Sequence, residues 1–337
     1  MNKYLAYHAV LGPAMTTPPP SWKSGAGMDS SLTGGVNRVV NGDFAAWRGT
    51  PTLISTVWAD ASYGQATGLN FLDAGGTYGT WTGDLDLTCG GIWASDGDSW
   101  ADAASGAWNS SHRMWQRWSA ILTNAQTKWT RIARGTLYLR LAHELNGNWY
   151  DWEVTPAQVA DFKTAWQRFY SLKQSLFPDA QLVFNTTGAT RGQAYDWRTI
   201  WPGDSYVDVY SVDWYADNYY QVNILGHSGS DGYGGPVGLN EHFAFAVSHN
   251  KPFAISEWGV DPIYGRGDDP QYIQFVHDFC VANGGTGAAK LNYESYFNFT
   301  KSASDRRQLY YAPGYADAIG QTATEFPQAA AQYISAF

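Results

Sequence analysis

Residues 136–187, TLYLRLAHELNGNWYDWEVTPAQVADFKTAWQRFYSLKQSLFPDAQLVFNTT, contain one complete strand–helix–strand unit. The segment 136–143 is mostly apolar, which predicts a buried strand. Thr155 followed by Pro156 predicts an N-cap and the start of a helix that runs to about residue 176. A second apolar strand is predicted at 181–187. Strands that alternate with helices in this way are typical of a parallel sheet.

The same alternation extends along the chain of 337 residues. Strands are predicted at 4–10, 52–58, 84–93, 136–143, 181–187, 206–214, 252–257 and 288–298. Helices are predicted near 104–130, 156–176, 193–200, 240–249, 270–282 and 326–336. Eight strands in one chain favour an α/β fold, a closed (β/α)8 TIM barrel forming a single catalytic domain over residues 1–337. The Gly-, Pro- and Ser-rich stretch 12–35 is predicted to be a long loop.

An open, doubly wound sheet is the alternative architecture for this alternation. Such a sheet carries a glycine-rich phosphate turn after its first strand. The residues at that place, HAVLGP at 8–13, do not match G-x-G-x-x-G. The barrel is therefore the preferred prediction.

The composition excludes several classes of protein. Hydrophobic residues make up 44% of the chain and charged residues 15%, which excludes a disordered chain. No apolar run reaches the length of a transmembrane helix. The net charge of −9 and the lack of a Lys/Arg run argue against nucleic-acid and membrane partners. Cys89 and Cys280 are expected to be unpaired buried thiols, with one disulfide as the alternative.

Two glutamates end predicted strands, where a TIM barrel builds its active site. Glu144 follows strand 136–143 and Glu257 ends strand 252–257, although only six of the 30 acidic residues are Glu. Alternation puts Arg140 and Glu144 on one face of their strand, and Ile255 and Glu257 on one face of theirs. If both faces point inward, the two carboxyl groups meet across the barrel mouth. A core salt bridge, for instance with Arg140, is the alternative role.

Paired carboxyl groups across a pocket suit glycoside hydrolysis, in which one protonates the leaving oxygen and the other attacks the sugar or activates water. The aromatic content of 16% supports a sugar ligand, because flat rings stack on sugar faces. Aromatic residues at predicted strand ends are Trp58, Trp93, Trp149, Trp152, Trp214, Tyr215, Trp258 and Tyr296. The helical series Trp108, Trp115, Trp118 and Leu122 is instead interpreted as core packing.

Several motifs together resemble glycoside hydrolase family 26. Residues 140–152, RLAHELNGNWYDW, resemble the family's R-x-x-H-E-x-N-G-x-W-x-x-W signature. Further similar blocks are AWQR at 165–168, WPGDSYVDV at 201–209, SVDWY at 211–215, ISEWG at 255–259 and YFN at 296–298. Gln167 stands where the family usually has Arg. These blocks cover about residues 135–300, whereas residues 1–100 match poorly.

The resemblance implies a retaining β-glycanase with catalytic residues Glu144, the general acid/base, and Glu257, the nucleophile. Tyr215 would hydrogen-bond the nucleophile, and Arg140 would keep it ionised or form a structural ion pair. His143 would contact substrate, provided that a bulge turns it toward the mouth; a structural role is its alternative. Together with the aromatic residues at strand ends, the predicted substrate-binding residues are His143, Trp149, Trp152, Tyr215, Trp258, Arg140, Trp214 and Tyr296. His8, at the end of the first predicted strand, is a further candidate for the rim.

The leading hypothesis is an endo-acting retaining glycosidase that hydrolyses a β-linked polysaccharide or oligosaccharide by double displacement. The alternatives are a phage- or surface-associated glycan depolymerase on the same barrel, and a non-catalytic carbohydrate-binding barrel. No cofactor and no metal are expected, and the protein is expected to be a monomer. The substrate argues for an extracellular or periplasmic location, although the N-terminus MNKYLAYH does not read as a secretory signal. The resemblance leaves mannan, mixed-linkage β-glucan, β-1,3-xylan and exopolysaccharides open, and the poor match before residue 100 argues against plain plant mannan.

Overall fold

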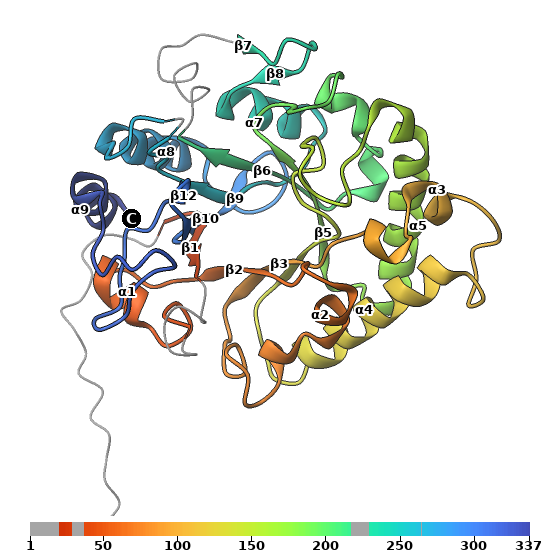
Figure 1. Cartoon of the computed structure of the whole chain (residues 1–337), viewed down its shortest axis with the longest axis horizontal. Coiled ribbons are helices and arrows are strands. Elements are labelled where there is room, and N and C mark those ends of the chain that lie inside the picture. Colours follow the sequence, from red (N-terminus) through yellow and green to blue (C-terminus); the bar gives the residue numbers. More distant parts are fainter. Residues whose placement is uncertain (1–19, 29–36, 217–228, 264) are drawn as a thin grey trace, which may run out of the picture.

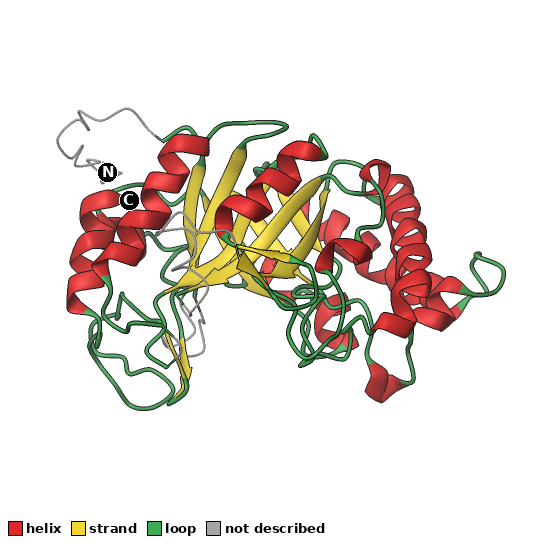
Figure 2. Cartoon of the chain, turned by 90° about the horizontal axis from the view of Figure 1, so that it is seen from above, coloured by secondary structure: helices red, strands yellow, loops and turns green. Residues whose placement is uncertain are grey.

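The computed structural model describes residues 20–28, 37–216, 229–263 and 265–337. Eight parallel strands form a closed barrel at its centre. In barrel order they are β1 (Lys23–Gly27), β2 (Ile54–Trp58), β3 (Asp84–Thr88), β4 (Leu137–Arg140), β5 (Gln181–Thr187), β6 (Val209–Tyr215), β9 (Phe253–Gly259) and β10 (Leu291–Phe297). β10 pairs back onto β1, which closes the barrel. Figures 1 and 2 show the strands at the centre of the molecule with helices outside them.

Helices connect most of the strands and confirm the (β/α)8 architecture. They are α1 (Asp43–Arg48), α2 (Tyr63–Gly68), α3 (Trp100–Ala104), α4 (Arg113–Trp129), α5 (Val159–Leu176), α7 (Leu239–Ser248), α8 (Pro270–Asn283) and α9 (Pro327–Ala336). Short 3-10 helices lie at Asn70–Leu72, Ala94–Asp96, Pro156–Gln158, Trp197–Ile200 and Asp204–Tyr206. Two short antiparallel hairpins lie outside the barrel sheet. They are β7 (Gly229–Ser230) with β8 (Pro236–Val237), and β11 (Thr300–Ser302) with β12 (Asp305–Arg306).

The first barrel strand is not where the sequence predicted it. β1 lies within the stretch 12–35 that was predicted to be a loop, so that prediction is wrong for residues 23–27. The segment 4–10, with His8, lies outside the described residues. The sequence of β1, KSGAG, has no β-branched or aromatic residue, because the strand packs too closely for one. A Cβ on Gly25 would lie 1.8 Å from the backbone oxygen of Ile54, and one on Gly27 would lie 2.5 Å from the Trp58 ring.

The barrel interior has an apolar lower layer and a polar upper layer. The lower layer takes one inward residue from each of six strands: Ile54, Tyr138, Val183, Val209, Ala254 and Tyr293. Above it, toward the carboxyl ends of the strands, the inward residues are buried and polar, among them Thr56, Asp86, Arg140, Asn185 and Ser211. A barrel normally fills such layers with branched apolar residues. The polar layer therefore marks the end at which a candidate site is to be sought.

The larger hydrophobic core lies between the barrel and its helices. Trp118 and Leu122 of α4 are fully buried there, and Trp108 and Trp115 are partly buried against them. This confirms the interpretation of the tryptophan series as core packing. Cys89 and Cys280 are both buried and unpaired, as expected. Among the residues that the structure describes, no helix is both long and apolar enough to span a bilayer.

Candidate active site

An open pocket of about 500 Å³ lies at the carboxyl ends of the barrel strands. Both predicted catalytic residues, Glu144 and Glu257, line it, together with Trp149 and Tyr215 from the predicted substrate-binding set. The remaining lining residues are Trp58, Tyr150, Thr187, Arg191, Asp261, Phe297, Lys301, Asp305 and Arg307. The pocket thus combines two carboxyl groups with aromatic faces and several cations.

A β-bulge turns Glu257 into this pocket. Ala254 belongs to the inward apolar layer, so simple alternation would turn Glu257 outward with Phe253 and Ile255. The pairing of β6 with β9 slips at this point: Val212 faces Ile255, but Asp213 faces Glu257. The sequence prediction that Ile255 and Glu257 share an inward face is therefore wrong. Glu257 nevertheless reaches the mouth, because a bulge inserts one residue and reverses the alternation above it.

Glu257 is held by three donors from three strands. Oε1 accepts hydrogen bonds from Arg140 Nη1 and Trp58 Nε1, both at 2.8 Å, and Oε2 accepts one from Tyr215 OH at 2.8 Å. Burial alone would raise the pKa of this carboxyl group, but the charge and hydrogen bond of Arg140 reverse the effect and lower its pKa to about 2. Glu257 is consequently ionised throughout the neutral range and points both oxygens at fixed donors.

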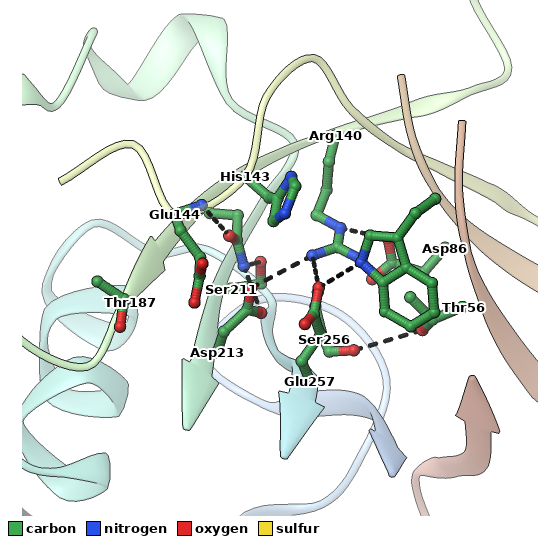
Figure 3. A network of polar contacts seen from close by, with 12 residues as sticks. Thr56, Asp86, Arg140, His143, Glu144, Thr187, Ser211, Asp213, Ser256 and Glu257 are labelled. Atoms are coloured by element: carbon green, nitrogen blue, oxygen red, sulfur yellow. Dashed lines mark hydrogen bonds and ion pairs between the residues drawn. The ribbon is translucent and has the colours of Figure 1, made fainter. Parts of the chain in front are cut away.

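Arg140 lies at the centre of a buried polar network (Figure 3). Its Nε donates to Asp86 Oδ1 at 2.8 Å, and its Nη1 lies 3.4 Å from Asp213 Oδ2. Burial raises the pKa of both aspartates, while the charge of Arg140 opposes that rise. Asn185 ties the network to β5 by donating to Asp213 Oδ1 at 2.8 Å. The guanidinium group of Arg140 therefore pairs most closely with the carboxylates of Glu257 and Asp86.

Glu144 has the opposite environment. It lies just beyond β4 in a left-handed backbone conformation with φ of 49°, which is strained for a residue with a side chain and often marks a functional position. Its backbone N–H donates to Asn185 Oδ1 at 2.7 Å, and its Oε2 accepts a hydrogen bond from Trp149 Nε1 at 2.7 Å. Burial and then the negative charge of Glu257 raise its pKa to about 7. The pocket thus holds one carboxyl group that is ionised at neutral pH and one that titrates near neutral pH.

His143 lies next to Glu144 in sequence but does not line the pocket. Its side chain is buried, its ring packs 4.4 Å from the Tyr150 ring, and its Nδ1 lies 3.5 Å from Asp60 Oδ2. Burial lowers the pKa of His143 to about 3, so the imidazole is neutral. The same cause raises the pKa of Asp60 to about 6. His143 therefore supports Tyr150, which does face the pocket.

Four aromatic residues predicted to bind sugar are buried away from the pocket: Trp152, Trp214, Trp258 and Tyr296. The last three alternate with inward residues on their strands, so their rings point outward. Trp258 packs among Tyr296, Tyr333 and Phe337 and donates to Glu294 Oε2 at 2.5 Å. Trp152 stacks on Tyr150 and donates to the backbone oxygen of His143 at 2.8 Å. Their predicted contact with substrate is wrong, because they pack within the protein.

Sequence reasoning missed several residues of the site. Asp213, which belongs to the buried network around Arg140 and does not line the pocket, could have been found, because it shares the inward face of β6 with Tyr215. Lys301 and Arg307 lie in and after the β11–β12 hairpin, where no periodicity indicates which way a side chain points. Among the described residues, no group of three or more His, Cys, Asp or Glu side chains is arranged to hold a metal ion.

The barrel and its paired carboxyl groups define a class, the glycoside hydrolases built on (β/α)8 barrels. The family model described as "Glycosyl hydrolase family 26" matches residues 113–227, which include Arg140, Glu144 and Tyr215. The match, which covers about a third of the chain, confirms the resemblance seen in the sequence over those residues, and the chain is a glycoside hydrolase similar to that family. No curated protein sequence matches the chain.

Solved structures with similar folds include two mannanases. The catalytic domain of a family 26 endo-β-1,4-mannanase from Bacillus sp. JAMB-750 has 16% identity and a TM-score of 0.59, covering 94% of this chain and 85% of that one. A modular endo-β-1,4-mannanase from Cellulomonas fimi has 16% identity and a TM-score of 0.60, covering 94% and 71%. A fungal β-1,4-galactanase has 14% identity and a TM-score of 0.56, covering 95% and 100%. At these identities the likeness shows the fold alone.

Proposed function

We propose that this chain is a retaining endo-β-glycanase in which Glu144 is the general acid/base and Glu257 the nucleophile. The observation that carries the proposal is that two carboxyl groups line one pocket in opposite environments. Glu257 accepts a hydrogen bond from Arg140, which lowers its pKa to about 2, whereas burial and the charge of Glu257 raise the pKa of Glu144 to about 7. A retaining hydrolase needs one carboxyl group of each kind on either side of the glycosidic bond.

In the first step, a Glu257 oxygen attacks the anomeric carbon as the glycosidic C–O bond breaks. Glu144 transfers its proton to the leaving oxygen, and the glycone remains bound to Glu257 as an ester. Tyr215 and Trp58 hold the two oxygens of Glu257 by hydrogen bonds of 2.8 Å, which fixes the direction of attack. Arg140 keeps the attacking carboxyl group ionised.

In the second step, water replaces the departed sugar beside Glu144. The ester neutralises Glu257, which removes the charge that raised the pKa of Glu144 and lets its carboxylate act as a base. Glu144 takes a proton from the water, whose oxygen attacks the anomeric carbon and releases the Glu257 carboxylate. Two inversions at this carbon give a product of retained configuration.

The geometry also orients the substrate. The leaving sugar departs on the side of Glu144, where the ring of Trp149 is 46% exposed and available for stacking. The glycone lies on the side of Glu257 and Trp58. An open pocket, rather than a closed one, suits binding within a long chain and supports endo action. The similar solved structures are those of two endo-β-1,4-mannanases and a β-1,4-galactanase, but at such low identity they do not indicate which sugar this chain binds.

The test uses the variants Glu144→Gln and Glu257→Gln, with Glu241→Gln in the first turn of α7 as a matched control. Reducing-sugar release is measured on mannan, mixed-linkage β-glucan, β-1,3-xylan and galactan. We expect both site variants to lose activity while folding normally by circular dichroism, and the control to match the wild type. Full cleavage by either site variant contradicts the proposal.

A second measurement separates the two roles. NMR of freshly released product is expected to show the β-anomer first, as retention requires. A 2-deoxy-2-fluoro glycoside with a good leaving group is expected to label Glu257, as read from the mass of its peptide. Release of the α-anomer first, or a label on Glu144, would overturn the assignment.

A further inference from the structure

Lys301 lies where two pockets meet. It is part of β11, directly after the last barrel strand, and its side chain is exposed. It lines the catalytic pocket and also a neighbouring pocket of about 330 Å³. Trp58, which donates to the nucleophile, is the other residue that lines both. A glycan that extends beyond the catalytic centre in this direction would pass Trp58 and Lys301.

The ammonium group of Lys301 rests on aromatic faces and not on a carboxylate. Its Nζ lies 4.7 Å from the ring centre of Phe297, 5.6 Å from that of Phe299 and 5.7 Å from that of Trp58. No carboxylate of a described residue forms an ion pair with it. Cation–π contacts of this kind hold the position of a charge without neutralising it.

The acidic groups around Lys301 are engaged elsewhere. Arg307 pairs with Asp261 Oδ2 at 2.8 Å and also with Asp305, and Arg140 pairs with Glu257 at 2.8 Å. Asp60 is close enough for the charge of Lys301 to act on it, but its Oδ2 lies 3.5 Å from His143 Nδ1 and it forms no ion pair with Lys301. Lys301 thus presents a positive charge to the pocket that the neighbouring acids leave available.

The neighbouring pocket is otherwise uncharged. Its described lining includes the rings of Phe71 and Phe299 and the amide of Gln65, and Lys301 is the one charged side chain among the described residues that line it. A carboxylate or sulfate that enters such surroundings loses water and needs a cation as partner. A neutral sugar would leave the charge of Lys301 without a partner.

The position of this pocket indicates which part of the substrate enters it. It lies beside β2 and β11, whereas Glu144 and Trp149 follow β4. Because the leaving sugar departs beside the acid, the pocket beyond Trp58 receives the glycone side of the chain.

We propose, resting on the glycanase function above, that the natural substrate is an anionic glycan and that Lys301 binds a negatively charged substituent on a glycone-side sugar in this second pocket. The substituent is a carboxylate or a sulfate ester, since a lysine recognises charge without the planar geometry that an arginine requires.

The test compares glucomannan and mixed-linkage β-glucan in three forms each: unmodified, partly oxidised at C6 to the uronate, and partly sulfated. We measure kcat/KM by reducing-end release for the wild type, for Lys301→Met and for the control Lys163→Met on α5. Retention of the same six glycans in affinity gel electrophoresis is measured in parallel, so that binding is read even where no cleavage occurs.

We expect the wild type and the control to prefer an anionic form over its neutral parent about tenfold, as a charge-assisted contact allows, and Lys301→Met to lose that preference. The oxidised and sulfated forms show which anion is preferred. The proposal is overturned if the wild type has equal kcat/KM and equal retention for the charged and neutral glycans, or if Lys301→Met keeps the wild-type preference for the charged forms. Absence of cleavage with selective, Lys301-dependent retention would count against the glycanase function while supporting anion binding.

Discussion

The hydrogen bond from Trp149 to Glu144 predicts a measurable shift in the pH dependence of catalysis. The indole Nε1 lies 2.7 Å from Glu144 Oε2. Because a donor favours the ionised form of its acceptor, this bond lowers the pKa of Glu144 against the larger effects of burial and of Glu257, which together bring it to about 7. The variant Trp149→Phe removes the donor but keeps an aromatic ring, so the pKa of Glu144 should rise.

The size of the shift follows from the contact. A hydrogen bond to a charged group contributes about 1.5–3 kcal/mol when it is well shielded. Trp149 is 46% exposed, so water replaces part of the bond and about 1 kcal/mol is a suitable figure. Since one pKa unit corresponds to about 1.4 kcal/mol, the pKa of Glu144 should rise by about 0.7 unit.

The assay is the pH profile of kcat/KM, which reports the free enzyme. Activity falls with rising pH as the acid loses its proton, so the alkaline limb should move upward from about pH 7 in Trp149→Phe. The acid limb, which reports Glu257, should stay in place. Trp115→Phe on α4, away from the site, is the matched control. An alkaline limb that stays fixed or moves downward in Trp149→Phe would refute the reasoning.

Two further predictions concern the barrel. Gly25→Ala should destabilise the fold by about 3 kcal/mol through overpacking, because its Cβ would overlap the backbone of Ile54; urea unfolding tests this, and equal stability with the open-site control Gly75→Ala would contradict it. Burial raises the pKa of Glu294 to about 7, so the folded protein binds this proton more tightly than the unfolded chain does. The stability that this proton contributes is fully present below the unfolded pKa of Glu294 and is lost as the pH rises through 7. The free energy of unfolding of Glu294→Gln should therefore increase by about 3 kcal/mol relative to that of the wild type as the pH is raised from 4 to 8. Parallel stability profiles of the two proteins over that range would disprove this prediction.

Much of the fold follows from the sequence because most barrel strands are long apolar runs between helical segments. The exception, β1, consists of small residues that its neighbours require, and Gly25 and Gly27 made it resemble a loop. Strand propensity describes the backbone conformation that a residue prefers by itself, whereas glycine is required at these two positions because atoms of β2 leave no room for a Cβ. The local sequence pattern carries no information about such a contact.

The residues of the site also fall into those that the sequence predicts and those that it does not. Glu144, Glu257, Tyr215 and Trp149 were predicted and lie at the pocket, because motif and strand end coincide there. The outward-facing Trp214 and Trp258 could have been excluded by alternation alone, because each adjoins a residue, Tyr215 or Glu257, that was predicted to face the mouth. Lys301 follows the last barrel strand, where tertiary packing alone decides the direction of a side chain.

The bulge in β9 has a consequence for how such barrels diversify. Below it, the strand alternates to fill the apolar layer; above it, the alternation is reversed, so Glu257 faces the mouth and Trp258 faces the helices. If β9 alternated regularly, without the bulge, the two residues would exchange faces, and the indole would point to the mouth and the carboxylate to the helices. Within one scaffold, then, a single bulge determines whether this part of the mouth presents a carboxylate or an aromatic ring.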